Sequence, residues 1–307
     1  MRHLDLESLL CFVEVVRLGS ISAASRSLRL AQPALTRRIQ LLEEQLGDTL
    51  LERHRRGVVP TETGRLVEQR GKDLLRNAQE LCDEVTSAVT KPAGVVRFGF
   101  PPSVGSLFVG RILADCIARY PDIKLHLVEN VSPAVREGLI EGSLDMAIMS
   151  CRAGHDRLRC VPLFHEQLWL FASPELWDLG RESVPLSSIG SRPVMLASFL
   201  WSHFETKLPL NVIAAVDALP LAREAMLAKA GYGIFPFSAL EREIARGELS
   251  GAPIQDLTVS RGLYFRNDRI TSHAMRIVER LVEDQVGALL QAGQKLYRRI
   301  GSDDYVV

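Results

Sequence analysis

The most informative segment of this 307-residue chain is Gln32-Pro33-Ala34-Leu35-Thr36-Arg37-Arg38. Leu35 opens an apolar stripe that continues at steps of four, three and four residues, which is the spacing of one face of a helix. Pro33 falls in the first turn, where its missing N–H costs nothing, and Gly47 ends the pattern. The opposite face carries hydrogen-bonding side chains and no acidic residue before Glu43. These side chains are Gln32, Thr36, Arg37 and Gln40. Such a face is typical of a helix that lies in the major groove of DNA.

Two helices are predicted before this segment. The first has Asp5 as its N-cap and ends at Gly19, and its apolar positions recur at intervals of three and four. The second begins at Ser20 or Ser22, and its alanines at 23 and 24 allow a close approach between helices. The apolar positions of the first helix are Leu6, Leu9, Val13 and Val16. Three short helices in this order predict a helix-turn-helix domain.

A short β-hairpin is predicted after these helices. The segments Leu50-Leu51-Glu52-Arg53 and Val58-Val59-Pro60 flank the sequence His54-Arg55-Arg56-Gly57, and Gly57 stands at the bend. The tip of this hairpin is basic, as a wing that contacts DNA would be. A solvated run of surface arginines is the alternative interpretation.

One long helix is predicted next, capped by Thr61 and ended by Lys91-Pro92-Ala93-Gly94. Its small and apolar residues alternate steps of four and three, the period of a coiled-coil seam. The seam residues are Val67, Gly71, Leu74, Ala78, Leu81, Val85 and Ala88. We therefore expect this helix to form a dimer with its counterpart in a second copy.

Beyond residue 94, short β-rich runs alternate with helical segments, which predicts a mostly parallel α/β sheet. The first runs cover residues 95–100, 107–119, 123–128, 134–141 and 146–149. Further strands are expected within 168–171, 194–197, 212–216, 234–237 and 262–266, and a final helix from about Ser272 to Tyr297.

The charges of the whole chain balance, with 37 Lys and Arg against 37 Asp and Glu. Their distribution is more informative, because residues 1–60 contain no Lys while arginines cluster around 37–38 and 53–56. The sequence shows neither a run of about 18 uncharged apolar residues nor an export signal. We therefore expect a cytoplasmic location.

Neither a metal site nor a cofactor is predicted. The five cysteines form no Cys-x-x-Cys pair, and the seven histidines show no ligand spacing. Cys151 and Cys160 bracket the end of one strand and the start of the next, and we interpret them as reduced thiols rather than a redox pair.

Three classes of protein remain to be weighed. An enzyme is one, because α/β sheets host many activities, but no nucleophile elbow, phosphate loop or His-Glu-x-x-His motif occurs. A scaffold protein is another, but it would not need an arginine-tipped hairpin. The sequence therefore favours a DNA-binding protein that is not an enzyme.

Residues 6–64 resemble the N-terminal signature of the LysR-type transcriptional regulator family. The likeness runs through Phe12, Gly19-Ser20, Ala23-Ala24 and the segment 32–37, and continues through 42–47, 51–53 and 60–64. The remaining chain resembles the effector domain of that family. Two further segments, Pro101-Pro102-Ser103 and Val216-Asp217-Ala218-Leu219-Pro220, are similar to its nitrogen assimilation control subgroup.

The resemblance implies an α+β multi-domain chain. It has a winged helix-turn-helix DNA-binding domain at 1–61, a linker and dimerisation helix at 62–91 and a periplasmic-binding-protein-like α/β effector domain at 92–307. The effector domain has two lobes, lobe I at about 92–163 and 267–298 and lobe II at about 164–266. One departure is Ala31, where the family usually has a serine that caps the helix.

The family pattern also assigns binding residues. DNA contacts fall on Gln32, Pro33, Thr36, Arg37, Arg38, Arg53, Arg55 and Arg56. Effector contacts fall on Pro102, Ser103, Val104, Asn130, Ser132, Ser198, Phe199 and Phe235. A helix N-cap is the alternative role for Ser103 and Ser132. The segment between Met195 and Asn211 is shorter than is usual in the family, which implies a rearranged wall of the cleft.

The function implied is that of a sequence-specific transcriptional regulator. A homodimer or homotetramer would bind double-stranded DNA at an inverted-repeat operator and contact RNA polymerase. A small polar or anionic effector would bind between the lobes and favour one arrangement of the assembly.

Overall fold

The computed structural model describes residues 4–54, 57–87, 92–151, 157–180, 182–204, 210–269, 271–292 and 296–300. The chain divides into two compact units, Met1–Thr90 and Lys91–Val307.

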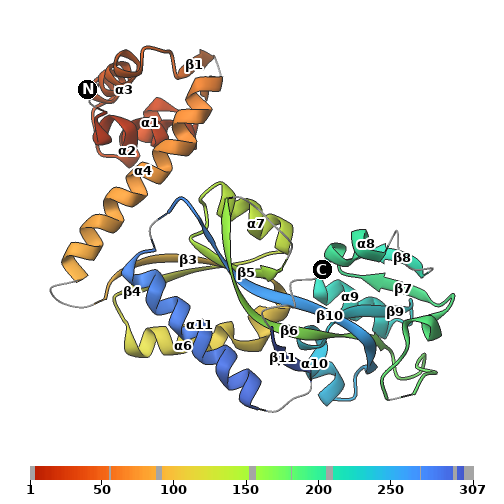
Figure 1. Cartoon of the computed structure of the whole chain (residues 1–307). Helices are drawn as coiled ribbons and strands as arrows, with labels where there is room; N and C mark the ends of the chain where they lie inside the picture. Colours follow the sequence, from red (N-terminus) through yellow and green to blue (C-terminus); the bar gives the residue numbers. More distant parts are fainter. Residues whose placement is uncertain are drawn as a thin grey trace. The chain divides into compact units, whose positions relative to one another are not determined.

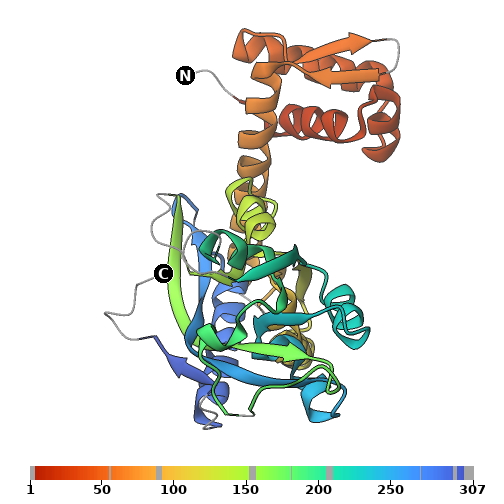
Figure 2. The same cartoon turned by 90° about the vertical axis from the view of Figure 1, so that its right-hand side faces the viewer.

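The first unit is a helical domain with a β-hairpin and one long helix (Figures 1 and 2). The predicted hairpin is confirmed, with Leu51 opposite Pro60 and His54 opposite Gly57. The three short helices pack around Phe12, Leu35 and Leu42, which are fully buried. The elements are α1 (Leu6–Leu18), α2 (Ile21–Ser27), α3 (Gln32–Leu46), β1 (Leu51–His54), β2 (Gly57–Pro60) and α4 (Glu62–Ser87).

Local capping sets the boundaries of α1 and α2. The Asp5 carboxylate accepts hydrogen bonds from the backbone N–H groups of Glu7 and Ser8, and the hydrogen bond from the Ser8 hydroxyl lowers the pKa of Asp5. Gly19 ends α1 in the left-handed region, at φ 62°. Ser20 caps α2 by accepting a hydrogen bond from the backbone N–H of Ala23. The predicted caps Asp5, Gly19 and Ser20 are thus confirmed.

The predicted seam of α4 divides between two faces. Val67 packs against the core of the first unit, and a Cβ at Gly71 would lie 2.7 Å from the side chain of Leu9. Leu74 and Leu81 are instead exposed, by 45% and 62%. The prediction of one continuous seam is therefore wrong for Val67 and Gly71, because α1 of the same unit occupies that side of the helix. Ala88 and the side chain of Val85 lie outside the described residues.

The second unit is built on one curled sheet with the order β4-β3-β5-β10-β6-β9-β7-β8, and β11 pairs with β6. Its strands are β3 (Gly94–Phe100), β4 (Ile123–Glu129), β5 (Met146–Ser150), β6 (Leu158–Ala172), β7 (Pro193–Leu196), β8 (Asn211–Ala215), β9 (Tyr232–Pro236), β10 (Ser250–Arg266) and β11 (Tyr297–Arg299). Its helices are α5 (Pro102–Val104), η1 (Gly105–Val109), α6 (Gly110–Arg119), α7 (Ser132–Ile140), η2 (Leu186–Ile189), α8 (Ser198–Phe204), α9 (Leu219–Leu227), α10 (Phe237–Ala245) and α11 (His273–Gln291).

Two long antiparallel strands, β6 and β10, pass through both ends of this sheet (Figure 1). At one end β3 runs parallel to β4 and β5, and at the other end β7 runs parallel to β8 and β9. Helices cover the strands at each end, so that separate hydrophobic cores form around Phe98 and Phe164 and around Leu170 and Ile234. The expected two-lobed α/β architecture is confirmed. The prediction of a mostly parallel sheet is wrong, because β10 pairs antiparallel with β5 and β6, and β6 also pairs antiparallel with β9 and β11.

The last helix is shorter than the sequence predicted. Ser272 caps α11, which ends at Gln291, two residues before Gly293. Tyr297 lies in β11 instead, and its ring contacts Phe164 edge-on with centroids 5.9 Å apart. Helical periodicity alone did not reveal that the chain returns to the sheet beyond the glycine.

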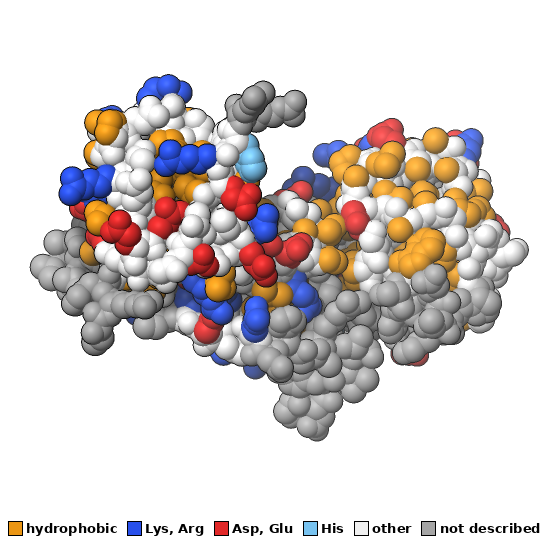
Figure 3. Space-filling model, turned by 90° about the horizontal axis from the view of Figure 1, so that it is seen from above, with side chains coloured by type: hydrophobic (Ala, Val, Ile, Leu, Met, Phe, Trp, Pro, Cys, Tyr) orange, Lys and Arg blue, Asp and Glu red, His pale blue; other side chains and the backbone are white. Residues whose placement is uncertain are grey.

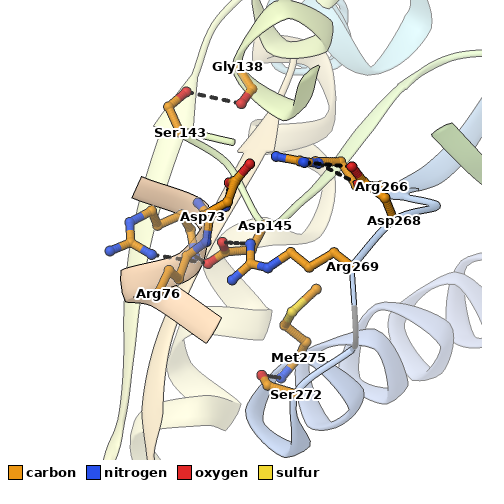
Figure 4. A network of polar contacts seen from close by, with 11 residues as sticks. Asp73, Arg76, Gly138, Ser143, Asp145, Arg266, Asp268, Arg269, Ser272 and Met275 are labelled. Atoms are coloured by element: carbon orange, nitrogen blue, oxygen red, sulfur yellow. Dashed lines mark hydrogen bonds and ion pairs between the residues drawn. The ribbon is translucent and has the colours of Figure 1, made fainter. Parts of the chain in front are cut away.

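A buried carboxylate joins three segments at the α11 end of the second unit (Figure 4). Asp145 is only 1% exposed, accepts a 2.8 Å hydrogen bond from the backbone N–H of Arg97 and forms an ion pair with Arg269. Each partner offsets the cost of burying the charge. Figure 4 also shows Arg266 paired with Asp268 on the neighbouring turn.

Candidate DNA-binding surface and effector pocket

Helix α3 separates a packed side from a polar side. Leu35, Ile39 and Leu42 are buried in the first unit. On the other side Gln32, Pro33, Arg37 and Gln40 are exposed, and Thr36 is half-buried. The polar face predicted from the sequence is therefore free to reach another molecule.

Helix α3 begins without a side-chain cap. Ala31 holds the extended conformation of an N-cap, at φ −65° and ψ 138°, but its methyl group accepts no hydrogen bond. The Gln32 side chain accepts a long hydrogen bond, 3.4 Å, from the Ser22 hydroxyl.

Ala31→Ser is expected to stabilise the first unit. A seryl oxygen at this position would accept a backbone N–H of the first turn, which contributes about 0.5–2 kcal/mol to the free energy of unfolding. We expect operator affinity to stay constant or to increase, because the serine also offers a hydroxyl to phosphate. Urea unfolding followed by far-ultraviolet circular dichroism measures the first effect and gel-shift titration the second. A clear loss of affinity would contradict this account of the helix start.

Arg38 differs from Arg37 in its surroundings. Its guanidinium forms an ion pair with Glu7 and lies 3.8 Å from a carboxylate oxygen of Asp5. A phosphate would have to compete with these two carboxylates. The phosphate contact predicted for Arg38 stays a prediction, and Arg37 is the better-placed arginine on α3.

The hairpin is fixed to the end of α1 by its backbone. The N–H of Val58 donates a 2.9 Å hydrogen bond to the carbonyl of Gly19, and a Cβ at Gly57 would lie 2.4 Å from the same oxygen. Only glycine fits this approach, at φ 136°. Arg53 is exposed on β1, whereas Arg55 and Arg56 lie outside the described residues.

A pocket of the second unit lies between its two lobes. It is narrow, and the roughly 430 Å³ of empty space within its bounds includes solvent at its open mouth. Its wall includes the predicted effector residues Pro102, Ser103, Ser132, Phe199 and Phe235. Further lining residues are Pro101, Val131, Ala197, Val216, Asp217, Leu219, Pro236, Ala239 and Arg261.

The remaining predicted residues lie around this pocket rather than in its wall. Asn130 lines a wider hollow next to it, which shares Pro102, Val131 and Asp217. The backbone N–H of Ser198 donates a 2.9 Å hydrogen bond to Asp217 at the rim. Val104 is fully buried in the hydrophobic core and lines neither of these two hollows.

A buried ion pair lies behind the pocket and reaches its wall through Arg261. Arg261 and Glu166 have side chains 1% and 0% exposed and lie 3.2 Å apart. The second Glu166 oxygen accepts hydrogen bonds from the backbone N–H and hydroxyl of Ser238. The guanidinium also donates to the hydroxyls of Ser103 at 3.0 Å and Ser150 at 3.3 Å. The network therefore ties β6 and β10 to segments of both lobes.

The hydrogen bonds within the pocket leave hydroxyl protons available to a ligand. The Ser103 oxygen accepts from Arg261, and the Ser132 oxygen accepts from the backbone N–H of Ser150 at 3.4 Å. Each hydroxyl can therefore donate its own proton into the pocket. Apart from Asp217 and Arg261, the wall around these donors is apolar, and the Arg261 guanidinium lies 6.0 Å from the centre of the Phe199 ring.

Arg261 is the main site residue that sequence reasoning missed. It stands within a β-rich run of the sequence, and its partner Glu166 is 95 residues away. Only the pairing of β6 with β10 reveals that the two charges meet. Pro101 and Val216–Leu219 were already part of motifs quoted from the sequence, and their likeness to a subgroup could have indicated the rim of the pocket.

The described residues also bear on two other classes of site. No cluster of three or more potential metal ligands occurs in that part of the chain. No helix within it is both long and apolar enough to cross a membrane.

Two family models cover most of the sequence. Residues 6–65 match the model described as "Bacterial regulatory helix-turn-helix protein, lysR family", and residues 90–286 match the "LysR substrate binding domain". The HTH-type transcriptional regulator BbuR of Bordetella bronchiseptica is 26% identical over 95% of this chain and 93% of its own length. The nitrogen assimilation regulatory protein nac of Escherichia coli is 27% identical over 74% of this chain and 77% of its own length.

Solved structures share the fold at lower identity. A full-length OxyR variant of Pseudomonas aeruginosa is 19% identical and superimposes with a TM-score of 0.72, over 92% of this chain and 95% of its own. Full-length CbnR complexed with its target DNA is 20% identical and has a TM-score of 0.53, over 92% of this chain and 100% of its own.

Proposed function

Because this chain belongs to the LysR family of bacterial transcriptional regulators, we propose that the polar face of α3 reads the major groove of its operator. As a member of this family the chain is a DNA-binding regulator with an effector-binding domain, and it is not an enzyme. The observation that carries the proposal is the exposure of Gln32 and Arg37 on a helix whose other side is buried.

The chemistry of this face suits base edges. The Gln32 amide can pair with N6 and N7 of adenine, and the Arg37 guanidinium can pair with O6 and N7 of guanine. Pro33 and Thr36 complete the start of the reading face, while Arg53 and the arginines at 55 and 56 supply the wing. In this proposal Arg38 contacts phosphate when DNA displaces Glu7.

Salt-dependent binding tests this assignment. A protein that neutralises phosphates releases their counterions. The logarithm of its binding constant therefore falls linearly with the logarithm of the salt concentration. We expect a steep slope with promoter DNA, which should become shallower by about one for each arginine removed from the wing. Affinity that does not change with salt would contradict a DNA-binding role.

The working form is proposed to be a dimer through α4 that assembles further into a tetramer. Leu74 and Leu81 support this proposal, because they are exposed seven residues apart on one side of the helix. The second unit exposes apolar groups as well, and Figure 3 shows hydrophobic side chains gathered over its β8 and α9 end. Ile213 and Leu221 are exposed there by 49% and 61%. A two-fold dimer would place paired recognition helices on an inverted repeat.

The double substitution Leu74→Lys and Leu81→Lys is expected to weaken dimerisation at least 10-fold. It places four charges in the proposed helix pair, and like charges directly opposite one another repel. Sedimentation velocity at micromolar concentration measures the change. Gln69→Lys is the matched control, because Gln69 is an exposed residue on another side of the same helix. Unchanged sedimentation of the double variant would exclude this face as the dimer contact.

The effector is proposed to be a small molecule with an acceptor group, such as a carboxylate, and a compact apolar body. The Ser103 and Ser132 hydroxyls would donate to the acceptor, and Phe199 and Phe235 would contact the apolar body. Binding shifts the balance between two arrangements of the regulator only by its differential affinity for them. This balance would in turn set how the regulator engages RNA polymerase in the cytoplasm.

A further inference from the structure

Two cysteines that are nine residues apart in the sequence meet over Gly262 of β10. The Sγ atoms of Cys151 and Cys160 lie 4.0 Å apart. Cys151 directly follows β5, where its N–H donates to the carbonyl of Ser260, and Cys160 lies on β6 opposite Tyr264. Both side chains are half-buried. The sequence alone indicated two unconnected thiols, because it does not show that β10 lies between these strands and bonds to both.

Gly262 provides the space in which the sulfurs approach. A Cβ at this position would lie 2.5 Å from Sγ of Cys160 and 2.9 Å from Sγ of Cys151. Both distances are shorter than any normal van der Waals contact, so a side chain at 262 would push the sulfurs away. The backbone of Gly262 does not have a positive φ, so the glycine is not needed for its conformation. Its missing side chain is what allows the thiols to meet.

The surroundings of the pair favour one thiolate. The hydrogen bond from the Cys151 thiol, assisted by Tyr264 and the charge of Arg136, lowers the pKa of Cys160 to about 7 against the opposing effect of burial. The same contact raises the pKa of Cys151, as does burial, so its thiol stays protonated. One sulfur is thus prepared as a nucleophile beside a second that can follow it.

We propose that Cys151 and Cys160 form a dithiol site that hydroperoxides oxidise to an intramolecular disulfide. The Cys160 thiolate attacks one peroxide oxygen, the O–O bond breaks and the leaving hydroxide takes a proton, which yields a sulfenic acid and water. The Cys151 sulfur then attacks Sγ of Cys160. The S–O bond breaks, the S–S bond forms, and the departing hydroxide leaves as water with the Cys151 proton. Two thiols and one hydrogen peroxide thus give one disulfide and two waters.

The test uses the full chain with the exposed Cys82 replaced by serine, which removes the most accessible competing thiol. The reduced protein is treated with an equimolar amount of hydrogen peroxide, its free thiols are alkylated, and it is digested with trypsin. The arginines at 152, 157 and 159 separate the two cysteines into different peptides, so a disulfide joins peptides that otherwise separate. We expect the 151–160 linked peptide as the main oxidised product, lost after treatment with dithiothreitol. Recovery of unlinked peptides only, with Cys160 intact or oxidised to sulfinic acid, would overturn the proposal.

Two variants isolate the geometry. Gly262→Ala keeps both thiols but fills the space between them, so we expect disulfide formation to slow at least 10-fold, with tryptophan fluorescence unchanged. Cys151→Ser removes the second thiol, so Cys160 should accumulate as sulfenic acid that a β-diketone reagent traps. The proposal is contradicted if Gly262→Ala forms the link as fast as the parent chain, or if Cys151→Ser yields no trapped sulfenic acid. These measurements do not depend on DNA binding.

Discussion

Arg37→Ala is expected to abolish most of the sequence-specific affinity for DNA. Arg37 is exposed on the reading face of α3 and forms no ion pair among the described residues, so its whole hydrogen-bonding capacity is available to a base. A bidentate contact between arginine and guanine discriminates by about 1–3 kcal/mol, and a dimer loses that contact in both half-sites. The expected loss is therefore about 30-fold at the least for a dimer bound to an inverted repeat.

The lysine variant separates base reading from charge. Arg37→Lys keeps the positive charge but loses the planar pair of donors. We expect it to retain the salt dependence of the parent chain while it loses preference for the operator over random DNA. Arg17→Ala is the matched control, because Arg17 is an exposed arginine on α1 that is paired with Glu14. Fluorescence anisotropy titrations at two salt concentrations measure all four proteins. An Arg37→Ala variant that binds the operator as the Arg17→Ala control does would contradict the assignment.

Arg261→Met is expected to destabilise the second unit by about 3–5 kcal/mol. Glu166 is 0% exposed and would lose its only ion-pair partner among the described residues, which leaves a buried charge uncompensated. The Ser238 hydrogen bonds remain but do not supply a positive charge. The variant should also lose the donors that orient the Ser103 hydroxyl in the pocket. We therefore expect a large decrease in stability together with loss of effector binding.

Urea unfolding followed by tryptophan fluorescence reports this change selectively, because Trp169, Trp177 and Trp201 all lie in the second unit. Adding Glu166→Gln to Arg261→Met should recover much of the lost stability of the second unit, because a neutral amide needs no counterion. Arg223→Met is the control, since Arg223 is 30% exposed and an exposed ion pair contributes about 0–1 kcal/mol. If Arg261→Met unfolds at the same urea concentration as Arg223→Met, the buried pair does not have the role given to it here.

The sequence was sufficient for the short helices and the hairpin of the first unit because their signals are local. The caps at Asp5 and Ser20 lie within three residues of the N–H groups they accept, and the apolar stripe of α3 repeats within a few turns. The hairpin bend at Gly57 is local as well, although its contact with Gly19 crosses almost forty residues. Signals of this kind can be interpreted before any tertiary contact is known.

The long helix shows where local reasoning failed. Periodicity assigned seven small or apolar residues of the predicted helix to one seam, but it cannot tell which partner each residue meets. Gly71 packs on Leu9 of the same unit, whereas Leu74 and Leu81 stay exposed. The partner of each residue depends on how α1 crosses α4, which is a tertiary property.

The pocket required the pairing of distant strands. Family likeness indicated Ser103 and Ser132, which follow strands of lobe I, but it did not indicate the charge beneath them. Arg261 reaches Glu166 only because β6 and β10 pair in one particular register, and the same pairing brings Cys151 close to Cys160. Neither contact leaves a signal in residue spacing, since both depend on a sheet assembled from segments far apart in the chain.

The most direct test of the account is selection of DNA by the purified protein from random duplexes, followed by sequencing of the bound fraction. The account requires an enriched inverted repeat, with half-sites spaced for paired recognition helices and one helical turn or a multiple of it between their centres. It also requires that the Arg37→Ala protein, selected in parallel, fails to enrich the same repeat. Bound DNA without a shared sequence, or the same repeat recovered by Arg37→Ala, would contradict the claim that the polar face of α3 reads the operator.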